Sequence, residues 1–173
     1  MSTTEQTMDQ MSAMMNPEPQ KEHKWLRKLL GDWTFESEVS EAGKPSDKCA
    51  GAESVRALGD LWVVGEGTGD MPGGGTAKTV LTLGYDIQKK RFVGTWVGSM
   101  MTNLWVYDGY LDENSNKLTL ESEGPDMSGS GKSARYRDII EFASDDHRIL
   151  RSETLGEDGK WTQFMVMHYR RRK

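Results

Sequence analysis

The spacing of apolar residues changes once along the chain, near residue 31. Within residues 20–30, four apolar residues fall on one face of a helical repeat: Trp25, Leu26, Leu29 and Leu30. Gly31 then provides a natural helix stop. From residue 32 onward apolar and polar residues alternate, with turn residues at regular intervals, which is typical of an all-β sandwich or barrel. The pattern predicts one short helix followed by antiparallel strands.

Ten segments fit the strand pattern. They are expected near residues 32–41, 48–58, 61–68, 76–85, 91–99, 104–111, 117–124, 134–143, 147–155 and 160–170. The intervening turns, such as 71–75 and 112–116, are rich in Gly, Pro, Asp and Asn. Closure of short antiparallel strands into a barrel removes the exposed edges of the sheet. We therefore expect an all-β, roughly ten-stranded antiparallel barrel with one short N-terminal helix.

Residues 1–19 differ in composition from the rest of the chain. They are polar, contain five of the eleven methionines and end with Pro17 and Pro19, which interrupt a helix. A flexible tail and a methionine-rich helix that covers an apolar surface both fit this composition. We expect a flexible Met-rich tail at residues 1–19 and a single barrel domain at residues 20–173.

The hairpin around residues 86–91 predicts which side chains face inward. If Tyr85 pairs with Phe92, two further pairs form along the strands: Leu83 with Gly94, and Leu81 with Trp96. Large residues opposite small ones suit the tapering interior of a small barrel. A slip of one residue would turn the other side chains of both strands inward.

The last two hairpins predict a second part of the interior wall. Pairing through their turns puts nine residues on one face: Ile140, Phe142, Ile149, Arg151, Glu153, Trp161, Gln163, Met165 and Met167. Such a face fits a ligand cavity with a few polar groups, and equally a solvent-exposed face with cross-strand ion pairs. Candidate ligand-binding residues from both walls are Leu81, Leu83, Trp96, Phe142, Arg151, Glu153, Gln163 and Met165. In this register Arg151 would hold a polar or acidic head group, and Trp96 an apolar body.

Three short motifs resemble a known family. The chain reads W-L-R-K-L-L-G-D-W at residues 25–33, G-Y-D at 84–86 and R-F-V-G-T-W at 91–96. These motifs resemble a bacterial family of uncharacterised lipocalin-like (calycin) domains, over roughly residues 21–171. The resemblance implies structural roles for Trp25, Gly31 and Trp33, with Trp33 closing the barrel floor against Arg170 or Arg171. It implies no activity, because function resides in a site and not in a fold.

Composition and charge narrow the classes of function. The hydrophobic content of 35% and the 19 glycines are those of a globular protein. A net charge of −5 disfavours nucleic-acid binding. No apolar run is long enough to cross a membrane, and the N-terminus lacks the basic region of a signal peptide. We expect a cytoplasmic protein with no nucleic-acid or membrane partner, while a homo-oligomer stays open.

Cysteine and histidine residues are few. Cys49 is the only cysteine, which excludes an intramolecular disulfide and a cysteine-rich zinc cluster. The three histidines, His23, His147 and His168, lack metal-ligand spacing, and we expect the first two in solvent. His168 is the candidate haem ligand by resemblance to nitrobindin-like barrels, but its predicted face is opposite the methionines of the same strand. We therefore predict no metal and no cofactor.

Catalytic motifs are incomplete. Residues 129–133, Gly-Ser-Gly-Lys-Ser, match the end of a P-loop, but Asp126 stands where the pattern requires its first glycine. Asp138, Glu141 and Glu153 are suited to acid–base chemistry, yet arginines alternate with them and predict cross-strand ion pairs. We predict no catalytic residue.

The sequence thus predicts a barrel that binds a small amphipathic or apolar molecule in its interior. Three alternatives remain: a haem-binding barrel, a structural module with a solid core, and an enzyme that uses a pocket carboxylate. A cavity would favour the binding protein over the solid module. A pocket carboxylate with a shifted pKa would favour the enzyme.

Overall fold

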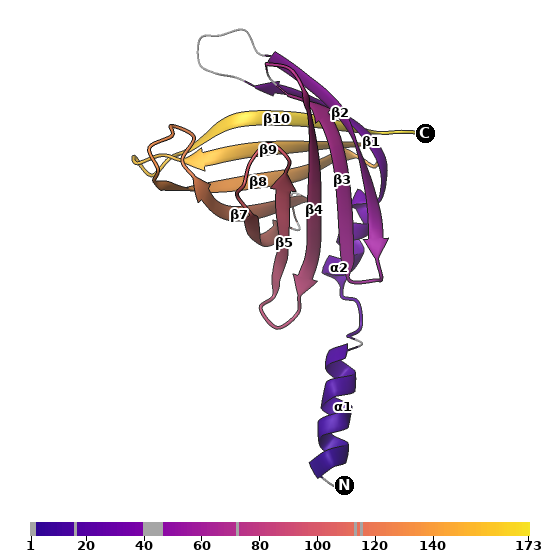
Figure 1. The fold of residues 1–173 in the computed structure, drawn as a ribbon. Coiled ribbons are helices and arrows are strands. Elements are labelled where there is room, and N and C mark those ends of the chain that lie inside the picture. Colours follow the sequence, from indigo (N-terminus) through magenta and orange to yellow (C-terminus); the bar gives the residue numbers. More distant parts are fainter. Residues whose placement is uncertain (1–2, 16, 40–46, 72, 113, 115) are drawn as a thin grey trace.

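The chain folds into a ten-stranded barrel with helices before its first strand (Figure 1). The computed structural model describes residues 3–15, 17–39, 47–71, 73–112, 114 and 116–173. The helices are α1 (Thr3–Met15), α2 (Lys21–Leu26) and the 3-10 turn η1 (Arg27–Leu29). The strands are β1 (Gly31–Val39), β2 (Asp47–Leu58), β3 (Trp62–Asp70), β4 (Thr76–Asp86), β5 (Arg91–Gly98), β6 (Trp105–Asp112), β7 (Lys117–Pro125), β8 (Ser133–Ser144), β9 (His147–Leu155) and β10 (Trp161–Arg171).

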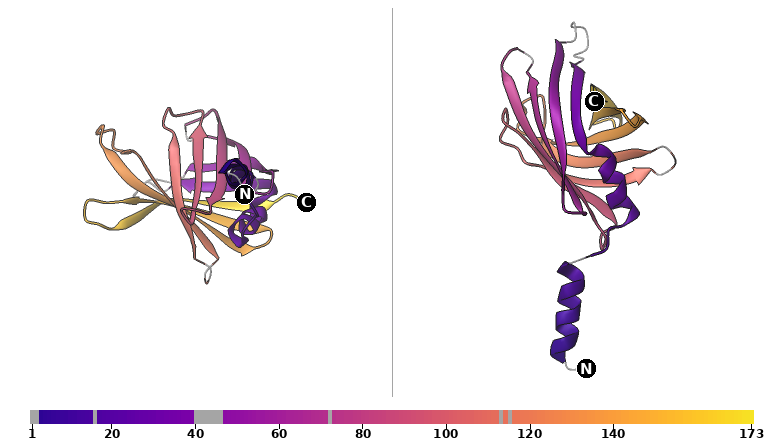
Figure 2. Two further views of the ribbon diagram at one scale, coloured as in Figure 1. Left: turned by 90° about the horizontal axis from the view of Figure 1, so that it is seen from below. Right: turned by 90° about the vertical axis from the view of Figure 1, so that its right-hand side faces the viewer.

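Each strand pairs antiparallel with the strands before and after it in sequence, and β1 also pairs with β10. This pairing closes the sheet, so no strand is left with an unpaired edge. The fold class predicted from the alternating pattern is confirmed. Figure 2 shows the closed wall of strands, with α2 beside one end of it.

The short helix α2 and the turn η1 seal that end of the barrel. Trp25, Leu26 and Leu29 are buried in one cluster with residues of the strands. The Trp25 ring packs edge-on against Phe92 and Phe142, at centroid distances of 6.2 and 5.7 Å. This apolar plug fills the closed end with side chains.

Trp33 lies at the centre of the closed end, with none of its surface exposed. Its indole Nε1–H donates a hydrogen bond to the carbonyl oxygen of Leu29 at 2.8 Å. The guanidinium group of Arg171 lies 4.2 Å from the centre of the Trp33 ring. Of the two predicted partners in the last strand, Arg171 is therefore the one that contacts Trp33.

Arg171 also connects the turn η1 to strand β10 by hydrogen bonds. Its guanidinium group donates to the carbonyl oxygens of Lys28 and Leu30, which lie at the end of η1. Unpaired carbonyl groups at the end of a helix attract cationic donors. Gly31 follows with a φ of +115°, and a Cβ there would lie only 2.8 Å from the Arg171 side chain. Glycine is required at this position for the backbone conformation and for the close approach.

His23 is buried, so its predicted exposure to solvent was wrong. Its Nδ1 accepts a hydrogen bond from the backbone N–H of Gln20 at 2.9 Å, and its Nε2 lies 3.0 Å from the carbonyl oxygen of Tyr85. A ring nitrogen that accepts carries no proton, so Nε2 is the donor to Tyr85. The histidine joins the start of α2 to strand β4.

Helix α1 precedes this plug and extends away from it in Figure 1. Its residues Met8, Met11, Met14 and Met15 are exposed. The division into a tail at residues 1–19 and a barrel domain at 20–173 stays a prediction. Within the described ranges, no helix is both long and apolar enough to span a membrane.

The register of the hairpin formed by β4 and β5 is as predicted. Tyr85 pairs with Phe92, Leu83 with Gly94 and Leu81 with Trp96.

The register of the last two hairpins differs from the prediction, because each contains an irregularity. Strand β8 shifts by one residue between Phe142 and Ser144, and β10 shifts between Gln163 and Met165. A shift of one residue turns every following side chain to the opposite face.

Candidate ligand-binding cavity

The barrel is hollow at the end opposite the helical plug. A cavity of about 330 Å³ lies there, at the lower end of the range for small-molecule sites. Its rim includes Met100 and Met101 from the β5–β6 turn and Met127 from the β7–β8 turn. A solid core is therefore present only toward the closed end, and the interior near these turns is open.

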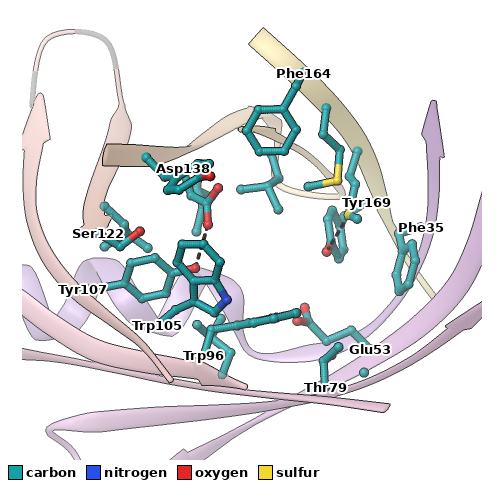
Figure 3. Close-up of a pocket in the computed structure, with 18 of the residues that line it drawn as sticks. Phe35, Glu53, Thr79, Trp96, Trp105, Tyr107, Ser122, Asp138, Phe164 and Tyr169 are labelled. Carbon is teal, nitrogen blue, oxygen red and sulfur yellow. Dashed lines mark hydrogen bonds between the residues drawn. The ribbon is translucent and has the colours of Figure 1, made fainter. Parts of the chain in front are cut away.

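Apolar and aromatic side chains form most of the cavity wall. Among the lining residues are Leu81, Trp96, Trp105, Leu120, Ile140, Leu150, Phe164, Met165 and Met167. Figure 3 shows Trp96 and Trp105 pointing into the space from neighbouring strands. Methionine side chains adapt readily to irregular apolar shapes, so the rim is suited to ligands of varied outline.

The predicted site residues fall into three groups. Leu81, Trp96 and Met165 line the cavity. Leu83 and Phe142 point inward as well, but they pack in the cluster at the closed end, below the cavity. The third group, Arg151, Glu153 and Gln163, does not line the cavity.

The irregularity in β8 explains the placement of this third group. Because one extra residue is accommodated after Phe142, Ile140 pairs with Leu150 and Phe142 pairs with Arg148. The inward residues of β9 are therefore Arg148, Leu150 and Ser152, and the predicted inward residues Ile149, Arg151 and Glu153 face outward. The shift in β10 returns Met165 and Met167 to the inner face and leaves Trp161 and Gln163 outside.

The outward polar residues form cross-strand ion pairs. Arg151 Nη1 lies 2.7 Å from a carboxylate oxygen of Glu141, and Arg137 Nε lies 2.5 Å from one of Glu153. The Arg137 guanidinium group also stacks over the Trp161 ring at 4.3 Å. These residues thus form cross-strand ion pairs on the outer face, and Arg151 does not line the cavity.

A buried ion pair between Glu53 and Arg148 forms part of the cavity wall instead. Glu53 is on β2 and Arg148 on β9, and a guanidinium N–H of Arg148 donates to a carboxylate oxygen of Glu53. Only 3% of Arg148 is exposed. Its guanidinium group lies between the rings of Trp33 and Tyr169, at 4.8 and 4.1 Å from their centres. Sequence reasoning missed both residues, because only closure of the barrel brings the two strands face to face.

Asp138 is the second acidic residue inside the barrel. Its Oδ2 accepts a hydrogen bond from the Tyr107 hydroxyl at 2.6 Å, and its Oδ1 accepts one from the Ser152 hydroxyl at 2.5 Å. Asp138 lines the cavity and is partly buried. Of the three carboxylates predicted to form surface ion pairs, Glu141 and Glu153 do so, and the prediction for Asp138 was wrong.

Burial changes the ionisation of these groups. It raises the pKa of Asp138 above its ordinary value, while the hydrogen bonds from Ser152 and Tyr107 oppose the rise. Burial also raises the pKa of Tyr107 well above its usual range, and the neighbouring Asp138 carboxylate adds to the effect. The pKa of Tyr169 is raised for the same primary reason, with Glu53 the next contributor. Both phenols therefore stay protonated and act as hydrogen-bond donors.

The histidines offer no ligand inside the cavity. His168 is exposed on the outer face, as predicted, and its Nδ1 lies 3.1 Å from Nε2 of His147. Partial burial lowers the pKa of His147, with smaller contributions from Arg170 and His168. Within the described residues, no group of three or more His, Cys, Asp or Glu side chains is close enough to hold a metal ion.

The segment that resembles a P-loop is a turn between β7 and β8. Asp126 accepts hydrogen bonds from the hydroxyl groups of Ser128 and Ser130, at 2.6 and 2.9 Å. The chain then continues into a strand and not into a helix. The turn lacks the helix N-terminus that a P-loop places at the phosphates, so a nucleotide site is not supported.

A family model described as "Protein of unknown function (DUF1579)" matches residues 18–171. The chain belongs to this family. No curated protein matches the chain. Among solved structures, the Rv2717c protein of M. tuberculosis is similar with a TM-score of 0.58 and 9% identity, covering 90% of this chain and all 100% of that one. The S-type phycobiliprotein lyase CPES of Guillardia theta is similar with a TM-score of 0.55 and 14% identity, covering 91% of this chain and 99% of that one. Identities this low show a common fold and no more.

Proposed function

We propose that this DUF1579 protein binds one small, largely apolar molecule inside its barrel. The observation that carries the proposal is the cavity of about 330 Å³, in a barrel whose other end is filled with side chains. Apolar walls provide the affinity of such sites, and a few fixed polar groups provide orientation. A barrel of this size holds a single compact ligand.

Three predicted residues are assigned to the contact with the ligand. Leu81 and Trp96 are cross-strand neighbours on β4 and β5, and Met165 lies on β10. The polar groups that would orient the ligand are Asp138 and the Glu53–Arg148 pair. We assign this role to them and not to the predicted residues Arg151, Glu153 and Gln163, which face outward.

A cavity-filling substitution tests the proposal. Leu81 lines the cavity, whereas its neighbour Val80 is exposed on the outer face of the same strand. A neutral probe, 2-naphthylmethanol, would be titrated into the parent protein and into Leu81→Trp, with binding followed by calorimetry. We expect Leu81→Trp to weaken binding at least about tenfold, and the matched control Val80→Trp to bind like the parent. Circular dichroism verifies that both variants fold, because overpacking by itself destabilises by about 1–3 kcal/mol.

Two outcomes would contradict cavity binding. One is equal affinity of the parent and the Leu81→Trp variant, which would place the probe elsewhere. The other is no binding by the parent, combined with no ligand in native mass spectra of the protein purified from its own host.

Proton transfer to or from a bound molecule is the second candidate function. The position of Asp138 favours it, because a cavity carboxylate with a raised pKa is typical of general acids and bases. The test uses 2-tetralone, whose acidic C–H groups exchange with deuterium in heavy water. Exchange that the parent accelerates and Asp138→Asn does not would support this function, and equal rates with and without protein would exclude it for this probe.

We also propose that the protein works in the cytosol. Its single cysteine, Cys49, is buried, and chains without a disulfide framework are typical of reducing compartments. Immunodetection in fractions of the host cell tests this location, and recovery of the protein outside the cytosolic fraction would contradict it.

A further inference from the structure

The cavity contains one more acidic group than basic groups among its described lining residues. Its lining includes three charged residues: Glu53, Asp138 and Arg148. Arg148 is paired with Glu53, and these two charges compensate each other. Asp138 is left as an acidic group without a cationic partner among the described residues.

The hydrogen bonds of Asp138 do not replace a counter-ion. Its partners are two neutral hydroxyl groups, of Tyr107 and Ser152. Charged groups inside proteins are ordinarily paired, because burial of an isolated charge is costly. Asp138 therefore either holds a proton or ionises when a cation enters the cavity.

Aromatic rings line the same cavity as this carboxyl group. Figure 3 shows the hydrogen bond between Tyr107 and Asp138, and Trp96 and Trp105 among the side chains that line the same cavity. The Trp105 ring packs edge-on against Tyr136 at a centroid distance of 5.1 Å. In the described part of the chain no lysine or arginine lies over the rings of Trp96, Trp105 or Tyr136. Faces of tryptophan and tyrosine rings attract organic cations.

We propose that the cavity selects ligands that carry one amine cation. The cation pairs with the carboxylate of Asp138, and the apolar body of the ligand fills the space toward Leu81 and Met165. The assignment rests on the proposed function, because it names the class of molecule that the cavity takes. An ammonium group donates hydrogen bonds and accepts none, so it complements a carboxylate whose hydroxyl partners are both donors.

Arg148 is the one cation among the described residues that line the cavity, and it is already paired with a carboxylate. Arg148 is enclosed by Glu53 and by the rings of Trp33 and Tyr169. A carboxylate ligand would have to displace Glu53 from Arg148, or bring a third negative charge next to Glu53 and Asp138. Like charges in such proximity disfavour each other strongly.

Three probes that share one ring system test the proposal. They are 2-naphthylmethylamine, a cation at neutral pH; 2-naphthylmethanol, which is neutral; and 2-naphthoic acid, an anion. Titration calorimetry on the full-length parent protein should show the amine binding at least about tenfold more tightly than the alcohol, with the acid the weakest. This comparison requires no variant, so it holds even if a substitution at Asp138 prevents folding.

Variants on β8 then locate the effect. Asp138→Asn removes the charge but retains the size of the side chain, and should weaken the amine at least about tenfold, a larger factor than that by which it weakens the alcohol. Glu141→Gln is the matched control, because it removes the same charge three residues along the strand, from the outer face. It should leave all three affinities within about twofold of the parent.

The failures of the two proposals are distinguishable. Equal or tighter binding of the alcohol or the acid by the parent would overturn the selection of amines and leave cavity binding standing. An amine preference that survives Asp138→Asn would overturn the role of Asp138. No binding of any of the three probes would overturn the selection of amines, and combined with no ligand in native mass spectra of the protein from its own host it would overturn the proposed function as well.

Discussion

Removal of the Trp33 side chain should be among the most destabilising substitutions in this protein. The residue is fully buried, and truncation of a buried tryptophan to alanine costs about 3–5 kcal/mol. Two guanidinium groups lie over the ring, those of Arg171 at 4.2 Å and Arg148 at 4.8 Å. Each such contact contributes about 0.5–2 kcal/mol. The hydrogen bond to Leu29 at 2.8 Å adds about 1 kcal/mol. Because these contributions overlap, we expect Trp33→Ala to cost about 4–5 kcal/mol.

Urea unfolding followed by far-UV circular dichroism measures this loss independently of tryptophan fluorescence. The matched control is Trp62→Ala on β3, because 40% of Trp62 is exposed. We expect that control to cost less than about 2 kcal/mol, in line with a partly exposed position. A loss at Trp33 no greater than the loss at Trp62 would refute the role of Trp33 as the floor of the barrel.

The remaining predictions concern the buried charges and the N-terminal segment. Glu53→Gln should cost about 3–5 kcal/mol, because Arg148 would be left buried and unpaired, and the double variant with Arg148→Met should recover at least half of that loss in urea unfolding; simple addition of two losses would contradict the pairing. Burial raises the pKa of Asp138 above its ordinary value of 3.8. The free energy of unfolding therefore falls as the pH rises through the raised pKa, because Asp138 ionises less readily in the folded protein than in the unfolded chain. Asp138→Asn should therefore gain stability relative to the parent as the pH increases from about 4 to 8, and a difference that does not change with pH would disprove this. Deletion of residues 1–19 should shift the thermal midpoint by less than about 2 °C, because the methionines of α1 are exposed; a fall of more than about 5 °C would show that they pack on the barrel.

The architecture of this protein is determined by local features that can be recognised in the sequence. Alternation of apolar and polar residues, interrupted by Gly, Pro and Asp-rich turns, is sufficient to locate ten strands within a few residues of their observed bounds. The pairing of Tyr85 with Phe92 also follows from the sequence, because a regular hairpin with a short turn has one preferred register. Leu81 and Trp96 could therefore be predicted to face inward.

The polar part of the cavity depends on tertiary structure. The irregularities after Phe142 and Gln163 carry no distinct signal in the sequence, yet they decide that Arg148 faces inward and Arg151 outward. Successive side chains of a strand point to opposite faces of the sheet. One inserted residue therefore moves every following side chain from the inner face to the outer face, or the reverse. The strand propensity of these residues is the same in either register. Only packing against the rest of the barrel distinguishes the two registers.

Barrel closure decides the remaining contacts. Glu53 and Arg148 are 95 residues apart, and Tyr107 and Asp138 are 31 residues apart. The sequence alone determined that these residues lie on strands, but not that they meet. Their partners are set by the curvature of the closed sheet, which brings the inner faces of distant strands together across the barrel interior. Charges in such a space must be paired or neutralised, and for that reason the interior, and not the strand pattern, decides the chemistry of this protein.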